Sequence, residues 1–148
     1  LAQTRRHLVA PALNIMRTKN KILHSPAILP SSWSKRINQD NIDIAHLHWV
    51  GAEMASISDI GSIKKPVVWT LHDMWPFCGA EHYSNNQRYI SGYTKSNKPV
   101  NDSGIDINRI IYNTRATYLQ HAARYYRYTF LQRTTYQEDY EYAHSQYL

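Results

Sequence analysis

The chain has a single cysteine among its 148 residues, Cys78, and no run of about 18 consecutive apolar residues. The lone thiol excludes a framework of intrachain disulfides. The lack of a long apolar run argues against a transmembrane helix. Residues 1–7 also lack the apolar core of a secretory signal peptide. We therefore expect a cytoplasmic protein.

Glycine is scarce as well, with 5 residues in the chain, and no Gly/Ser-rich linker divides the sequence. The length fits one domain with a core of its own. Acidic residues are few: 17 Lys and Arg against 11 Asp and Glu give a net charge of +6. This balance favours anionic partners, although a solvated basic face is the plainer interpretation. An anionic membrane surface is the functional alternative that we retain, as a peripheral contact.

The centre of the chain predicts an α/β fold. A serine before Trp33 marks the start of a helix over about 32–40, and residues 42–49 form an apolar segment typical of a parallel strand covered on both faces. Ser56 is placed to cap a helix that runs to about Ile63, and Pro66 ends it. Residues 67–71 then form a second strand. Strand, helix and strand make a βαβ unit, so we expect parallel strands with a right-handed crossover.

The two ends of the chain are less regular. Residues 1–24 are basic and weakly periodic, with Pro11 inside the one apolar stripe. Residues 78–106 read as a polar loop, and loops of this length are usually either functional or disordered. Apolar and aromatic residues near helical spacing then predict a helix over about 107–131 within a Tyr-rich tail.

Polar and aromatic residues follow both predicted strands. His48-Trp49 ends the first strand and His72-Asp73 ends the second. Ligands of α/β proteins bind beyond the carboxyl ends of parallel strands, so these residues are candidates for substrate contact. An aromatic and small-residue loop follows and supplies further candidates: Trp75, Gly79, His82 and Tyr83.

Plainer interpretations remain open at each position. Asp73 is also suited to cap the following turn, and the aromatics to pack in a core or at its rim. His46 is expected to pack beneath the sheet end while His48 faces the cleft. A metal site of His46 and His48, with Asp73, Cys78 and His82 as further ligands, would suggest a metal-dependent hydrolase, but the pattern is weak and we expect no metal.

Two longer motifs carry a resemblance. The segment from Asp43 reads Asp-Ile-Ala-His-Leu-His-Trp-Val, and Ser56-Ile-Ser-Asp-Ile precedes Lys65-Pro-Val-Val-Trp-Thr-Leu-His-Asp-Met-Trp. Together they resemble the N-terminal domain of bacterial glycosyltransferases of family 4. The resemblance covers about residues 25–108. It implies a partial Rossmann-like parallel sheet with flanking helices, which is half of a GT-B architecture.

The resemblance also implies a function. Such enzymes transfer a sugar, with retention, from a nucleotide-sugar donor to a saccharide or lipid-linked acceptor in cell-surface polysaccharide synthesis. His72 and Asp73 are the implied catalytic residues. The implied substrate-binding residues are His48, Trp49, Trp75, Gly79, His82 and Tyr83. Ala80 stands where many relatives have a second glycine, so a loop needing positive φ there would be strained.

The family's first βα unit and its donor-binding domain are not recognisable in this sequence. We therefore expect an incomplete N-terminal domain over 1–107 and a helical, Tyr-rich tail of uncertain origin over 108–148. A nucleotide sugar would bind only together with the missing domain. No other cofactor and no nucleic acid is expected. The alternative is a non-catalytic, vestigial or acceptor-binding module. With either function the protein is expected in the cytoplasm, free or peripheral to the inner membrane.

Overall fold

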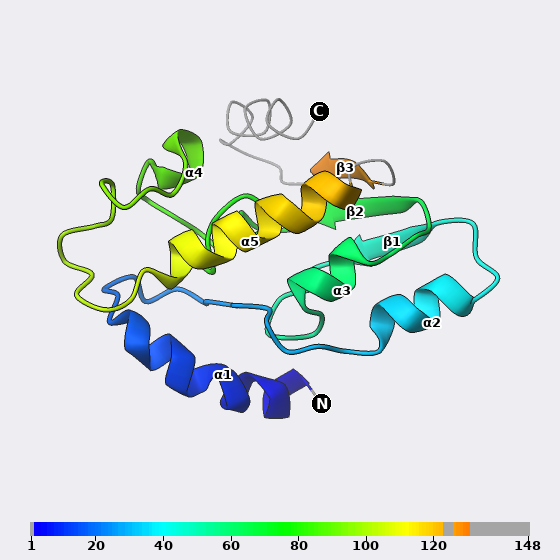
Figure 1. Cartoon of the computed structure of the whole chain (residues 1–148), viewed down its shortest axis with the longest axis horizontal. Coiled ribbons are helices and arrows are strands. Elements are labelled where there is room, and N and C mark those ends of the chain that lie inside the picture. Colours follow the sequence, from blue (N-terminus) through cyan, green and yellow to red (C-terminus); the bar gives the residue numbers. More distant parts are fainter. Residues whose placement is uncertain (1, 123–125, 131–148) are drawn as a thin grey trace.

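The computed structural model describes residues 2–122 and 126–130, and these residues form a mixed α/β fold (Figure 1). Three parallel strands lie in the order β1-β2-β3. Helices α3 and α5 pack against each other in front of the sheet, whereas α1 lies apart at its lower side. The elements are α1 Ala2–Met16, α2 Trp33–Gln39, β1 Ala45–His48, α3 Ile57–Gly61, β2 Val67–Leu71, α4 Arg88–Ser91, α5 Ile107–Ala122 and β3 Tyr126–Phe130.

The predicted βαβ unit is present, with α3 between parallel strands β1 and β2. The register pairs Ala45 with Val67 and Leu47 with Trp69, and all four side chains are buried. Helices α2 and α3 and strand β2 lie close to their predicted bounds, but β1 is shorter than the expected 42–49. Only β1 alternates between buried and exposed residues, whereas β2 is buried at four of its five positions and α2 has no buried residue.

One face of β1 is open. Its burial alternates, so that Ala45 and Leu47 are buried while His46 and His48 are exposed. The expectation that His46 packs beneath the sheet end is therefore wrong, as is a first strand covered on both faces. Alternation along a strand places His46 and His48 on the same side of the sheet.

The start of α3 explains its sharp boundary. The Ser56 side chain accepts a hydrogen bond from the Asp59 backbone, and the Asp59 carboxylate accepts one from the Ser56 backbone, which together form a capping box. Asp59 also accepts from the Ser31 backbone at 2.8 Å. Burial opposes ionisation of Asp59, but the hydrogen bonds from Ser56 and Ser31 outweigh it and lower the pKa of that carboxyl.

Helix α5 begins as predicted but ends at Ala122. The expectation of a helix to about residue 131, within a wholly helical tail, is wrong here because Tyr126–Phe130 forms β3, paired with β2. The aromatic and β-branched residues of this segment favour a strand once the edge of β2 is available for pairing. Residues 131–148 of the expected tail lie outside the described residues.

The first half of α5 belongs to the core. Ile111 joins the hydrophobic cluster, and the buried Arg115 guanidinium donates to the carbonyls of Cys78 and Gly79 at 2.6 and 2.9 Å. Arg115 also lies over the Trp75 ring, 4.1 Å from its centroid. These contacts bind α5 to the turn that follows β2.

The long segment between β2 and α5 is tied down by charge. The buried Arg88 of α4 pairs with Asp106 at 2.7 Å and donates to Asn97 at 3.0 Å. This network closes most of the predicted 78–106 loop onto itself.

Among the described helices, none combines the length and the hydrophobicity needed to cross a bilayer.

Candidate strand-end site

The ends of β1 and β2 meet, as expected for parallel strands. His48 is the last residue of β1 and His72 follows β2, and their Nδ1 and Nε2 atoms are 2.9 Å apart. Both imidazoles are exposed. Behind them, the His46 ring centroid lies 4.2 Å from that of His48, and His46 Nε2 is 2.8 Å from Thr70 Oγ1. Three imidazoles therefore line one edge of the open face.

The charge state of this row follows from its geometry. Loss of water around the His48 ring, followed by the neighbouring His46 and His72 imidazoles, lowers the pKa of His48 below its ordinary value of 6.5. A neutral His48 lets one imidazole of the His48–His72 pair donate and the other accept. Within the described residues, Nε2 of His48 and Nδ1 of His72 take no hydrogen bond, so both are available to a ligand.

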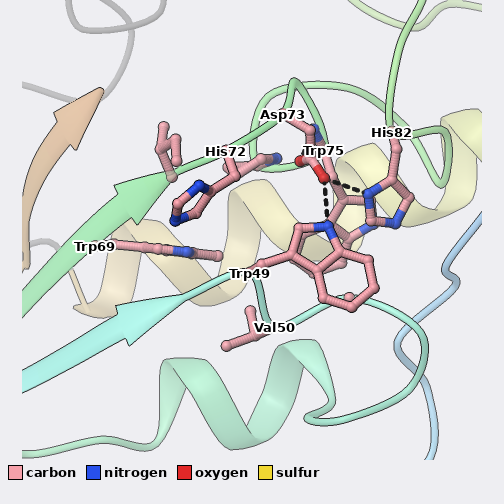
Figure 2. A pocket seen from close by; sticks show the side chains of 10 residues that line it. Trp49, Val50, Trp69, His72, Asp73, Trp75 and His82 are labelled. Carbon is pink, nitrogen blue, oxygen red and sulfur yellow. Dashed lines mark hydrogen bonds and ion pairs between the residues drawn. The ribbon is translucent and has the colours of Figure 1, made fainter. Parts of the chain in front are cut away.

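Asp73 lies next to His72 in the chain but is buried at 6 % exposure. Its Oδ2 accepts from Trp49 Nε1 at 2.8 Å and contacts His82 Nδ1 at 2.5 Å, as the dashed lines in Figure 2 show. Its Oδ1 accepts from the Trp75 backbone at 3.0 Å. The expectation that Asp73 caps the next turn is met by this last bond, and its side chain is directed into protein rather than toward an open cleft.

Trp49 is the aromatic residue that the site presents. Its indole is 39 % exposed, and its backbone φ of 35° lies in the left-handed region that a bulky residue rarely adopts. Ala52 and Glu53, three and four residues on, have φ values of 52° and 62°. The loop that follows β1 is therefore strained at several positions.

Side chains from elsewhere hold this loop in place. The Ser25 hydroxyl accepts from the Ala52 backbone at 2.8 Å. The buried Glu53 carboxylate accepts from the Ala27 backbone at 2.6 Å and from the Ile28 backbone at 3.1 Å. These hydrogen bonds to the segment before α2 offset the strain in the loop.

Three of the predicted substrate-binding residues are buried: Trp75, Gly79 and His82. Trp75 donates from its indole to the Ser25 carbonyl at 2.8 Å and stacks on His82. The cavity beside them has a volume of about 10 Å³, room for one water and not for a sugar. These residues support the site from beneath.

Close packing against α5 explains why residue 79 is a glycine. A Cβ there would lie 2.5 Å from Asn108 Cβ and 2.6 Å from Asn108 Cα, so the glycine admits α5. The Asn108 side chain in turn accepts from the Ala80 backbone at 2.9 Å. Ala80 itself is not in the positive-φ region, so the strain expected from alanine at that position is not present.

Tyr83 lies at the exposed rim. It is 40 % exposed, and its hydroxyl donates to the His72 carbonyl at 3.4 Å. His48, Trp49, His72 and Tyr83 are thus the predicted residues that a ligand can reach.

The suggested metal ligands do not come together as one group, although Asp73 and His82 are in contact. His46 and His48 are on the open face, whereas Cys78 is fully buried, and burial followed by the nearby Glu81 raises the pKa of its thiol well above the usual value. In the part of the chain that the structure describes, no three His, Cys, Asp or Glu side chains form a metal-sized group.

Sequence reasoning missed three supporting residues: Ser25, Glu53 and Arg115. Arg115 is 2 % exposed, so its side chain is not available to nucleic acid. Ser25 and Glu53 carry no local signal, because their partners are distant in sequence.

A scan against protein-family models finds no match to this chain. Searches of curated proteins and of solved structures also return no significant match.

Proposed function

We propose that this chain forms the acceptor-side part of a glycosyltransferase of GT-B type, with a partial Rossmann-like sheet that resembles family 4. One observation carries the proposal. The two strand-end motifs that resemble the family, 24 residues apart in the chain, meet in space through the His48–His72 pair at 2.9 Å and the Trp49–Asp73 hydrogen bond at 2.8 Å. A half-exposed indole beside free imidazole nitrogens is suited to a sugar, which presents both an apolar C–H face and hydroxyl groups.

In this proposal the reaction is a retaining transfer from a nucleotide sugar. His72 is the catalytic residue, because its free Nδ1 can hydrogen-bond a hydroxyl of the reacting sugar or acceptor. His48, kept neutral by its surroundings, orients His72 through their shared hydrogen bond. The contribution of the site is positioning and preorganised hydrogen bonding, which lower the barrier to the transfer without a covalent bond between the sugar and the protein.

Asp73 has a different role from the one the resemblance implies. Its carboxylate already accepts from Trp49, His82 and the Trp75 backbone. We therefore assign the buried carboxylate to holding the site together, and leave substrate contact to His72, His48, Trp49 and Tyr83.

The proposed setting is the cytoplasmic face of the inner membrane, with a saccharide or lipid-linked acceptor of cell-surface polysaccharide synthesis. Exposed Arg17, Lys19 and Lys21 follow α1 and favour an anionic surface. A nucleotide sugar is the donor, bound with a second domain. Metal is not required by this proposal.

A non-catalytic acceptor-binding module is the second candidate. It is favoured by the cavity of about 10 Å³ at the strand ends, which cannot enclose a reacting sugar. The two candidates share the binding surface and differ in turnover.

The test is saccharide binding followed by NMR chemical shifts, with methyl glycosides of glucose, galactose and mannose as probes. We expect at least one dissociation constant of about 1 mM, equivalent to about 4 kcal/mol. His72→Ala should abolish binding. The matched control, His46→Ala, removes the neighbouring imidazole that is bonded to Thr70 and should preserve it.

Absence of binding to every glycoside, or equal loss in both variants, would refute a saccharide site. The chain alone should not turn over UDP-glucose, because the proposed donor site needs a second domain. Turnover by this chain would contradict that requirement, and turnover only in a two-domain form would separate the enzyme from the binding module.

A further inference from the structure

A continuous chain of hydrogen bonds, buried except at its Trp49 end, runs from Ser25 to the exposed residue Trp49. Ser25 Oγ is 2.7 Å from His82 Nε2, and His82 Nδ1 is 2.5 Å from Asp73 Oδ2. The same carboxylate oxygen accepts from Trp49 Nε1 at 2.8 Å. Ser25, His82 and Asp73 are 0, 3 and 6 % exposed, so water does not compete for the two bonds that join them, whereas the bond from Trp49 is partly buried.

For a neutral His82 and an ionised Asp73, the positions of the protons follow from the partners. Because the Asp73 carboxylate can only accept, His82 carries its proton on Nδ1. His82 Nε2 is then an acceptor, and the Ser25 hydroxyl donates to it. The Ser25 oxygen still accepts from the Ala52 backbone at 2.8 Å. Every donor and acceptor in the chain is matched by this one assignment.

The order serine, histidine, aspartate is that of a hydrolytic triad. The surroundings exclude that use. The serine is fully buried, its oxygen already accepts a backbone hydrogen bond, and the adjoining cavity holds about one water. We therefore look for its role at the other end of the hydrogen-bond chain, where Asp73 accepts from Trp49.

Trp49 needs such support. Its φ of 35° is unfavourable for a bulky side chain, and its ring is 39 % exposed. Released from Asp73, the residue would relax toward ordinary backbone angles and the indole would change direction. Ser25 restrains the same loop a second time through Ala52.

We propose that His82 and Asp73 are positioning residues that lock the Trp49 indole as a fixed stacking face for a pyranose ring, while Ser25 restrains the same loop through Ala52. This inference rests on the proposed saccharide function for its ligand, but the lock itself is a property of the free protein. A preorganised aromatic face binds a sugar without the cost of ordering a mobile side chain.

The test uses the full chain labelled with 5-fluorotryptophan, whose Trp49 fluorine resonance is assigned with Trp49→Phe. Two variants divide the bonds of His82. In His82→Asn the amide nitrogen replaces Nδ1 and keeps the bond to Asp73. In His82→Gln the amide oxygen takes the place of Nε2 and accepts from the Ser25 hydroxyl, so the bond to Ser25 is kept and the bond to Asp73 is lost. The two variants remove the same ring, so they serve as matched controls for each other.

The Trp49 resonance should stay near its wild-type position in His82→Asn. In His82→Gln it should move toward the position in the denatured chain. The resonance of Trp33, on helix α2, reports whether each variant is folded. Equal displacement of Trp49 in both variants, or no displacement in either, overturns the relay, because packing alone would respond to the lost ring and not to the retained bond.

A wild-type measurement covers the case in which a variant fails to fold. The Trp49 indole N–H, although its ring is half-exposed, should exchange with solvent at least about tenfold more slowly than a free indole, because opening the bond costs energy. Exchange at the free rate overturns the proposal.

Binding of the methyl glycosides then addresses the ligand. Affinity should fall about tenfold in His82→Gln and stay within about twofold in His82→Asn. If the fluorine spectra respond as expected but wild type binds no glycoside, the saccharide function is refuted and the relay stands. If glycosides bind equally well to all forms while Trp49 is undisturbed, the relay is refuted and the function stands.

Discussion

Replacing Asp73 by asparagine should lower the free energy of unfolding by more than is usual for so conservative a substitution. The wild-type carboxylate satisfies three donors: Oδ2 takes Trp49 Nε1 and His82 Nδ1, and Oδ1 takes the Trp75 backbone. An amide has one acceptor oxygen. If that oxygen replaces Oδ2, the amide nitrogen confronts the Trp75 N–H. If it replaces Oδ1, the amide nitrogen confronts the Trp49 indole N–H.

The magnitude follows from this count. One buried donor loses its partner, at about 1–3 kcal/mol, and the remaining bonds lose the charge assistance that makes a carboxylate bond worth about 1.5–3 kcal/mol. We expect a loss of about 3 kcal/mol in the free energy of unfolding. For a chain of this size each kcal/mol lowers the Tm by about 2–4 °C, so the Tm should fall by about 6–12 °C.

Urea unfolding at neutral pH, followed by circular dichroism, measures this loss. Asp43→Asn is the matched control, since Asp43 is exposed and should change stability by less than about 0.5 kcal/mol. His72→Ala, at the adjacent residue, should also cost little, because its ring is exposed. An Asp73→Asn variant as stable as Asp43→Asn would refute the structural role assigned to this carboxylate.

The position of the site could be predicted from the sequence, but not which of its residues face solvent and which are buried supports. The apolar patterns and the Ser56 cap identified β1, α3 and β2, and parallel strands bring their ends together. The convergence of His48 and His72 was therefore predictable. Which of two neighbours faces solvent was not, because His72 and Asp73 lie where the strand's alternation gives way to a turn.

The supporting residues are unpredictable for a different reason. Ser25 and His82 are 57 positions apart, and Cys78 and Arg115 are 37 apart. No local periodicity joins such pairs, so they become visible only when the fold closes. The end of α5 was missed in the same way, because Tyr126–Phe130 becomes a strand only beside the edge of β2.

Further predictions concern titration and packing. The lowered pKa of His48 means that its protonation favours the unfolded chain; the free energy of unfolding should therefore fall as pH drops below 6.5, and His48→Gln should flatten that fall in pH-dependent urea melts. Burial raises the pKa of Glu81, so its ionisation opposes folding and stability should decline as pH rises above 4.5; Glu81→Gln, which mimics the neutral acid, should remove this decline. Gly79→Ala should cost about 1–3 kcal/mol, because its Cβ would meet backbone Cα of Asn108 at 2.6 Å and push α5 outward. Gly92→Ala is the control: it has open space and a φ of 79°, so it should cost only the left-handed strain of about 1–2 kcal/mol. The two differ in kind as well as size, since displacing α5 also weakens the 2.9 Å bond from the Ala80 backbone to Asn108. Hydrogen exchange at the Ala80 amide should therefore accelerate in Gly79→Ala alone, and unchanged exchange there would show that α5 does not depend on this glycine.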